Sequence, residues 1–249
     1  MSIWFFLWLL LSGALLFFMG WNLLILYRQK KAWKVFAAKR KLRYRSTAMM
    51  SAPEISGVMN DFTVSMFTGE HMRPDQRSSR KLTAIEVNLT SVMPFEIAIA
   101  SGGMVDLARE LNFKEEIRPD LAGWDKGWVV YTQSRTAAEA YLTPERLQAL
   151  VGLLKEENAW VIFIARAKTT LLRLDTPLPL DTPVLIDKLC AAMTSVAREL
   201  ELKGHEDKIL MAEASRKTAH QKTVALHDQG DVVPDFALED DPPTPREPS

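Results

Sequence analysis

The 249-residue chain carries 31 basic and 31 acidic residues, but these charges are segregated along the sequence. Residues 28–45 contain nine basic and no acidic residues, whereas residues 228–249 contain one basic and seven acidic residues. The mildly acidic balance of the region between them argues against a nucleic-acid-binding domain. The single cysteine, Cys190, cannot form an intrachain disulfide, and we expect it to be a small buried apolar residue.

The first part of the chain is a long apolar segment over residues 3–27. Because about 20 apolar residues in a helix cross a bilayer core of roughly 30 Å, we predict a transmembrane anchor over residues 1–27. A cleaved signal peptide would need a basic N-terminal region and a shorter apolar stretch, and the segment has neither. Four aromatic residues are expected at the two membrane interfaces: Trp4, Trp8, Trp21 and Tyr27.

The basic residues that follow the apolar segment predict its orientation, because Lys and Arg are retained on the cytoplasmic side. We therefore expect a single-pass protein of the inner membrane, with its N-terminus outside and its C-terminal domain in the cytoplasm. Residues 28–49 form a basic juxtamembrane segment, which we expect to contact anionic lipid headgroups through residues 28–45. The positions nearest the membrane interface are Arg28, Lys30, Lys31 and Lys34. A docking site for one specific phospholipid or for nucleic acid is the less favoured alternative, and no nucleic-acid partner is expected.

Apolar residues recur at near-helical spacing within the basic segment, at Trp33, Phe36, Ala37 and Tyr44. This spacing predicts that the helix continues out of the membrane and lies partly along its surface.

One α+β domain is predicted over residues 50–204. Strands at 55–59 and 62–68 flank Asn60 and Asp61, a natural hairpin turn. Further strands with apolar alternation are expected in a mostly antiparallel sheet: 82–89, 95–100, 128–132, 160–165 and 170–174.

Two longer helices are expected in the C-terminal half of the domain. The first follows Thr143 and Pro144, a cap and a proline at the first helical position. The second begins after Thr182, and Gly204 is the expected end. A short helix is expected over 104–111, a polar helix or linker over 205–227, and a disordered acidic, proline-rich tail over 228–249.

Several short segments resemble an uncharacterised bacterial family, a domain of unknown function found beside N-terminal membrane helices. They are PEISG at 53–57, WVVY at 128–131, AEAYLTP at 138–144 and the strand pair over 160–174. The resemblance spans roughly residues 53–190 and implies a bacterial membrane-anchored α+β domain. It implies no activity, catalytic residue or ligand. Family members often have two membrane helices, whereas this chain has one.

No catalytic or metal-binding signature is present. The histidines His71, His205, His220 and His227 are not spaced as ligands on one helix or strand, so we expect no metal and no cofactor. A serine-hydrolase nucleophile elbow is also absent.

Two short motifs are candidates for binding. Gly102 and Gly103 lie between a strand and a helix, where backbone amides could face a small anion, although a tight turn explains them better. Trp124 and Trp128 flank a turn and could form a binding lip for a partner protein, although such pairs more often cover the end of a core.

The leading hypothesis is therefore non-enzymatic: a membrane-anchored domain that binds a partner protein or organises a membrane complex. The alternative is an enzyme or sensor that acts on a small anionic ligand at the membrane surface.

Overall fold

The structure is a computed structural model, and it describes residues 3–47, 51–71, 80–166 and 168–215. The predicted acidic tail and most of the predicted polar helix lie outside the described residues. The helices are α1 (Ile3–Arg40), α2 (Met104–Glu110), α3 (Arg135–Tyr141), α4 (Pro144–Leu154) and α5 (Pro183–Leu200), and residues 206–215 are also helical. The strands are β1 (Arg43–Arg45), β2 (Glu54–Met59), β3 (Phe62–His71), β4 (Arg80–Asn88), β5 (Ile97–Ala100), β6 (Glu115–Ile117), β7 (Val129–Thr132), β8 (Trp160–Arg166) and β9 (Thr169–Thr176).

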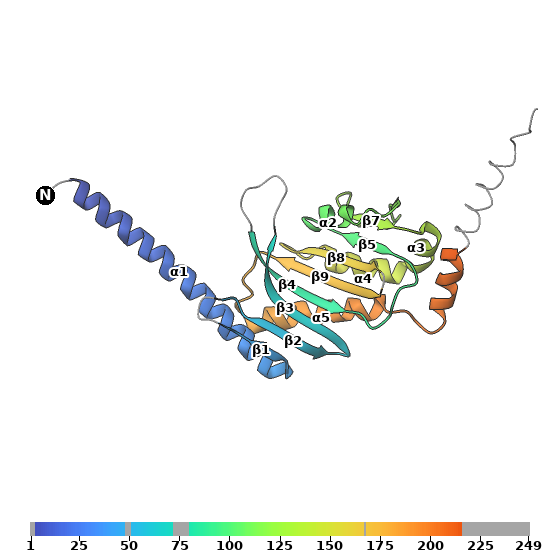
Figure 1. The fold of residues 1–249 in the computed structure, drawn as a ribbon, viewed down its shortest axis with the longest axis horizontal. Coiled ribbons are helices and arrows are strands. Elements are labelled where there is room, and N and C mark those ends of the chain that lie inside the picture. Colours follow the sequence, from blue (N-terminus) through green and yellow to red (C-terminus); the bar gives the residue numbers. More distant parts are fainter. Residues whose placement is uncertain (1–2, 48–50, 72–79, 167, 216–249) are drawn as a thin grey trace, which may run out of the picture.

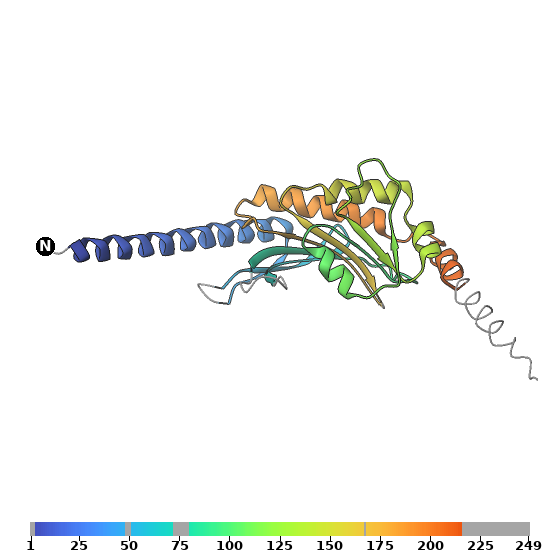
Figure 2. The same ribbon diagram turned by 90° about the horizontal axis from the view of Figure 1, so that it is seen from above.

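The described strands form one nine-stranded sheet in the order β1-β2-β3-β4-β9-β8-β5-β7-β6, and all neighbouring strands are antiparallel. Helices α4 and α5 and the end of α1 cover one face of this sheet (Figure 1). Helix α2 packs on the other face, over β5, β7 and β8 (Figure 2). The predicted α+β class, with a mostly antiparallel sheet and two longer helices, is confirmed.

Strand β5 shows how side-chain alternation divides the core between the two faces. Ile97 and Ile99 belong to the large apolar cluster beneath α4 and α5. Ala98 and Ala100 belong to a smaller cluster with Met104 of α2. The predicted alternation in this strand is therefore correct, and the two alanines leave room for α2 to approach the sheet.

The predicted hairpin is formed by β2 and β3. Asn60 and Asp61 have φ values of 52° and 72°, in the left-handed region that Asn and Asp tolerate better than most residues. The Asn60 side-chain amide also donates a hydrogen bond to the Thr194 hydroxyl at 3.0 Å. This bond ties the hairpin turn to α5.

Helix α1 is continuous from the apolar segment into the core of the domain. The most apolar 18-residue window of α1 is not buried at all, and α1 is long and apolar enough to span a membrane. Near its other end, Trp33, Phe36 and Ala37 are buried in the same cluster as α5. The Trp33 indole donates a hydrogen bond to the backbone carbonyl of Leu180 at 3.2 Å. The expectation that these apolar residues lie along the membrane surface is therefore wrong, because they pack against protein.

An ion-pair cluster and a close backbone contact hold the end of α1 in place. Asp187 of α5 accepts hydrogen bonds from Arg40 Nε at 2.8 Å and from Lys39 Nζ at 3.1 Å. Partial burial opposes ionisation of Asp187, but these two partners outweigh it and lower its pKa. Leu42 lies over Gly57 of β2, where an added Cβ would stand 2.8 Å from the leucine side chain.

Arg146 of α4 fastens the C-terminal end of α5. Its guanidinium donates hydrogen bonds to the backbone carbonyls of Tyr141, Glu199 and Glu201 at 3.0, 3.1 and 2.9 Å. It also pairs with Glu206 at 2.6 Å and lies 4.3 Å from the Tyr141 ring centroid. Since the last carbonyls of a helix have no partner within the helix, Arg146 supplies the donors that the end of α5 lacks.

The Arg146–Glu206 pair should make stability depend on pH. Burial opposes ionisation of Glu206, but hydrogen bonds from Arg146 and from the Lys203 backbone outweigh it and hold the pKa below the ordinary 4.5. A lowered carboxyl pKa stabilises the fold above the ordinary pKa, and this contribution disappears as pH falls through the folded-state value. In thermal unfolding of the full chain in detergent, we expect the advantage of wild type over Glu206→Gln to shrink below about pH 4.5. A constant difference between pH 7 and pH 3 would contradict this expectation.

Helix α5 differs from its predicted C-terminal boundary. It ends at Leu200, and Gly204 lies in the following turn with φ of 57°. Strands β1 and β6 are not predicted from the sequence, because three residues are too short to show alternation. Helix α3 is not predicted either.

Cys190 is fully buried within α5, as expected. Burial raises the pKa of the Cys190 thiol to about 12, so the reactive thiolate is scarce at neutral pH. We expect a maleimide to leave the folded protein unlabelled and to label one thiol per chain in denaturant, as measured by mass spectrometry. Rapid labelling of the folded protein would contradict the burial.

Candidate functional site

The sheet has a polar surface that no described helix covers. Helix α2 packs over β5, β7 and β8 and leaves β1, β2, β3, β4 and β9 uncovered on its side (Figure 2). We call this surface the open face. It is formed by Arg43, Arg45, Glu54, Ser56, Ser65, Phe67, Glu86 and Arg173.

Strand register arranges five of these residues in a single row across five strands. The paired positions run in the order Arg43, Ser56, Ser65, Glu86, Arg173. Both ends of the row are therefore arginines, and two hydroxyl groups and the Glu86 carboxylate lie between them. The residues come from three distant parts of the sequence, so only the sheet order brings them together.

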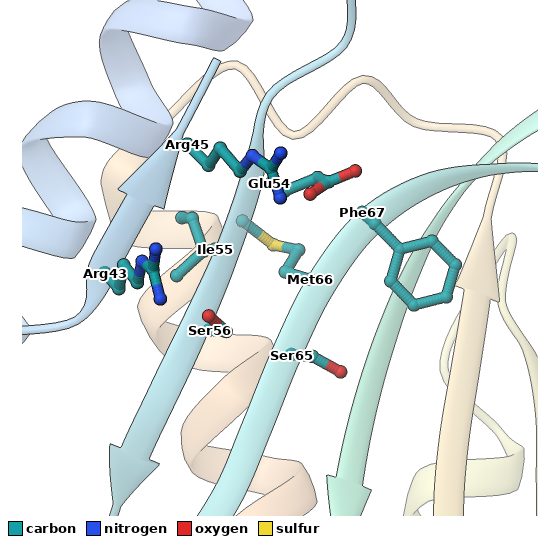
Figure 3. Close-up of a pocket in the computed structure, with 8 residues that line it drawn as sticks. All are labelled: Arg43, Arg45, Glu54, Ile55, Ser56, Ser65, Met66 and Phe67. Atoms are coloured by element: carbon teal, nitrogen blue, oxygen red, sulfur yellow. The ribbon is translucent and has the colours of Figure 1, made fainter. Parts of the chain in front are cut away.

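A hollow of about 360 Å³ lies at the β1 end of the open face (Figure 3). Arg43 and Arg45 come from the edge strand, and both side chains are exposed. Neither arginine forms an ion pair with another residue of the described chain. Because an arginine guanidinium binds carboxylates in a fork of two hydrogen bonds, this end of the row suits an acidic group of a partner.

Arg173 at the other end is already held by acidic neighbours. It forms two hydrogen bonds with Asp175, at 2.7 and 3.0 Å, and one with Glu86 at 3.1 Å. It also lies 5.5 Å from the Phe67 ring centroid. Burial alone would lower the pKa of Arg173, but Asp175 and Glu86 outweigh it and raise the pKa further. Arg173 is therefore a fixed charge with its donors largely occupied.

The open face holds no recognisable catalytic set. Within the residues that the structure describes, no group of three or more His, Cys, Asp or Glu side chains is arranged to hold a metal ion. The exposed arginines and hydroxyls are suited to binding, and a polar face of an antiparallel sheet is otherwise simply solvated.

Gly102 and Gly103, the predicted anion site, lie beneath the Trp160 ring. A Cβ added at Gly103 would stand 2.6 Å from Trp160 Cε3, and one at Gly102 would stand 2.4 Å from Trp160 Cδ1. The Met104 amide donates to the Ser101 carbonyl at 3.1 Å, so the backbone forms a tight turn into α2. The structure thus gives these glycines a packing role, and their binding of an anion stays a prediction.

This packing predicts opposite effects for two glycine-to-alanine substitutions. Gly103→Ala must displace Trp160 and should destabilise the chain by about 1–3 kcal/mol. Gly152→Ala, in α4, meets no atom within 4 Å and should stabilise it by about 0.5–1 kcal/mol. Chemical denaturation of the full chain in detergent measures both. Equal effects of the two substitutions would rule out the role assigned to Trp160.

Trp124 and Trp128, the predicted partner lip, form an edge-to-face pair with ring centroids 5.4 Å apart. Both are partly buried against the large apolar cluster. Asp125 shapes the turn between them by accepting a hydrogen bond from the Gly127 amide at 2.7 Å. They lie next to β7, whereas the hollow lies at β1, so the structure does not bring them into the open face.

The predicted membrane-interface residues all lie on α1. Trp4, Trp8, Trp21 and Tyr27 are exposed. Arg28, Lys31 and Lys34 are also exposed, and Lys30 is half-buried. The other five basic residues of the segment have different surroundings. Lys39 and Arg40 bind Asp187, and Lys41 is exposed. Arg43 and Arg45 belong to the open face.

Five residues of the open face are not predicted from the sequence as binding residues: Ser56, Ser65, Phe67, Glu86 and Arg173. Each lies in a predicted strand, and alternation places the four polar residues on the side opposite the buried apolar residues. Alternation therefore predicts the face of the sheet on which these residues lie. It does not predict the order of the strands, or that no helix covers β1, β2, β3, β4 and β9 on this side.

The geometry defines the chain as an α+β protein in which a long apolar helix runs directly into a domain built on a nine-stranded antiparallel sheet. No known protein family matches the chain, and no curated protein matches it. Among solved structures, it is similar to the crystal structure of the mycobacterial trehalose monomycolate transport factor A, with 11% sequence identity. The match covers 70% of this chain and 94% of that chain at a TM-score of 0.41, which is too low to establish a shared fold.

Proposed function

We propose that this chain is a single-pass inner-membrane protein whose cytoplasmic domain binds a partner protein through the open face. The observation that carries the proposal is the continuity of α1. One end of α1 is apolar and exposed, and the other end is buried in the domain core. A membrane-spanning α1 would therefore tie the height and direction of the open face to its own tilt in the bilayer.

The chemistry of the open face favours an acidic segment of a protein as the partner. Arg43 and Arg45 are exposed on an edge strand. Arg43 lies opposite Ser56, Arg45 lies opposite Glu54, and Phe67 adds an apolar contact (Figure 3). Arginine and aromatic residues contribute strongly to protein interfaces. Exposed basic residues on α1 would also attract anionic lipid headgroups at the membrane surface.

The proposed orientation can be tested by cysteine labelling, because buried Cys190 gives a low background. We expect Lys126→Cys, an exposed position, to react with a membrane-impermeant maleimide only after spheroplasts are permeabilised. Extraction of the membranes with alkali tests the anchor separately, and we expect the chain to stay in the membrane fraction. Labelling of intact spheroplasts would overturn the cytoplasmic placement.

The partner site can be tested by purifying crosslinked complexes of the full chain from solubilised membranes. We expect Arg43→Glu/Arg45→Glu to reduce recovery of the partner at least tenfold. The control Lys114→Glu/Lys208→Glu makes the same charge change at exposed residues away from the open face and from the Trp124–Trp128 turn, and should not reduce recovery. Equal recovery from both variants would exclude the open face, and a loss with Trp128→Ala alone would favour the Trp124–Trp128 pair.

A further inference from the structure

A second hollow lies where α1 leaves the domain, and we call it the boundary groove. It has a volume of about 490 Å³, within the usual range of small-ligand sites of roughly 300–1,000 Å³. One wall is α1 itself, and the other walls come from β3, β4 and the loop after β9. The lining residues are Asn22, Ile25, Leu26, Gln29, Ala52, Thr68, Lys81, Leu82, Thr83, Pro177 and Pro179.

The position of the boundary groove along α1 fixes its height relative to the apolar segment. Its α1 wall runs from Asn22 to Gln29, which is roughly 10 Å of helix. The same stretch contains Tyr27 and follows Trp21, the aromatic residues expected at the membrane interface. If α1 spans the bilayer as proposed above, the groove opens into the headgroup layer of the leaflet on the side of the domain.

The lining of the boundary groove is amphipathic. Ile25, Leu26, Pro177 and Pro179 present apolar surface, while Lys81 adds an exposed positive charge. A lipid from the adjoining leaflet has the matching character, because its acyl chain is apolar and its phosphate is negative.

One polar atom in the groove has no partner. Thr68 Oγ1 is buried and forms no hydrogen bond within the described chain. Its neighbours in the same cross-strand row, Thr83 and Thr176, both bond to the backbone of Leu178, at 3.1 and 3.2 Å. Buried hydroxyl groups are normally hydrogen-bonded, so the Thr68 hydroxyl is a donor that lacks its acceptor.

We propose that the boundary groove binds one anionic glycerophospholipid from the adjoining leaflet. The acyl chain lies against Ile25, Leu26 and the two prolines. Rotation of the Thr68 side chain turns its buried hydroxyl into the groove, where an ester or phosphate oxygen accepts its hydrogen bond. Lys81 pairs with the phosphate and favours an anionic headgroup. This inference rests on the proposed membrane anchor. It differs from the general attraction of anionic headgroups to the basic residues of α1, because it assigns one lipid to a defined site.

The test uses the full chain reconstituted in nanodiscs that contain phosphatidylglycerol or phosphatidylcholine with a photoactivatable acyl chain. Because α1 contacts lipid in any case, the readout is crosslinking on the domain side, in peptides that contain Lys81–Thr83 or Pro177–Pro179. We expect these peptides to be labelled, and more strongly by phosphatidylglycerol. Ala52→Phe should fill the groove and reduce this labelling at least fivefold, while Val58→Phe, at an exposed β2 position, should not.

Two milder substitutions separate the polar contributions. Thr68→Val removes the hydroxyl at nearly constant volume and should reduce labelling by both lipids about threefold. Lys81→Glu should remove the preference for phosphatidylglycerol, whereas Lys114→Glu, with the same charge change, should keep it. Matching thermal unfolding of each variant and wild type confirms that the fold is intact.

The outcomes distinguish failure of the groove from failure of the anchor. If the chain does not co-purify with nanodiscs, the anchor is wrong and the groove proposal falls with it. If the chain inserts but the domain-side peptides are unlabelled, or if Ala52→Phe and Val58→Phe behave alike, the groove proposal is overturned while the anchor stands. Equal labelling by both lipids would overturn the assignment of an anionic headgroup.

Discussion

A fragment that starts at residue 46 is expected not to fold, whereas one that starts at residue 28 is expected to keep the native domain. The shorter fragment lacks Trp33, Phe36, Ala37 and Leu42, which are all buried, and it also lacks the edge strand β1. Truncating a buried Phe or Trp alone typically costs about 3–5 kcal/mol. Loss of this whole set is therefore comparable with the total stability of a domain, about 5–15 kcal/mol.

Near-ultraviolet circular dichroism and binding of a hydrophobic dye measure this difference. We expect the fragment 28–249 to have fixed aromatic signals and low dye binding, and the fragment 46–249 to show the reverse. In the full chain, Trp33→Ala should lower stability by about 3–5 kcal/mol, while Val35→Ala, at an exposed position of the same helix, should have little effect. Cooperative unfolding of fragment 46–249 at the same midpoint would show that α1 is dispensable.

Replacing Arg146 by methionine is expected to cost about 3–5 kcal/mol, because it removes the donor from three backbone carbonyls at about 1–3 kcal/mol for each one that stays buried. The side chain is only 3% exposed, and its removal leaves the carbonyls at the end of α5 without their donors. Glu206 loses its ion pair and keeps the hydrogen bond from the Lys203 amide. Burial also raises the pKa of Tyr141 beside it, so the tyrosine stays neutral and cannot compensate. Chemical denaturation of the full chain measures the loss.

Arg146→Lys is the informative control, because it keeps the charge and removes the planar fork. We expect Arg146→Lys to lose most of the same stability, since one ammonium group cannot reach three carbonyls and Glu206 together. Arg135→Met removes an exposed arginine paired with Glu139 and should change stability by less than about 1 kcal/mol. Comparable losses for Arg146→Met and Arg135→Met would contradict the anchoring role of Arg146.

The sequence predicted those elements that a few neighbouring residues determine. The β2–β3 hairpin follows from Asn60 and Asp61, and the start of α4 follows from Thr143 and Pro144, where the Thr143 hydroxyl accepts a hydrogen bond from the Arg146 amide. These features depend on a few neighbouring residues, so a single sequence contains the necessary information.

The elements that were missed depend on the surroundings. The spacing of Trp33, Phe36 and Ala37 fits an apolar stripe against a membrane and against α5 equally well, and only the packed structure distinguishes the two. The open face depends on strand order, which places Arg43 and Arg173 in one row although they lie at opposite ends of the domain sequence. Alternation predicts which face of the sheet a side chain lies on, but it does not predict which strands are adjacent. The placement of Arg43 and Arg173 in one row could therefore not be predicted.

The unbroken path of α1 into the core has a mechanical consequence. With no described hinge between the apolar segment and the sheet, any tilt of the helix is transmitted to the whole domain as to a lever arm. Strand β1 lies beside α1 and β6 is the opposite edge, eight strand spacings away, or about 38 Å. A tilt of about 20°, which is common for membrane helices, would move that far edge by roughly 13 Å.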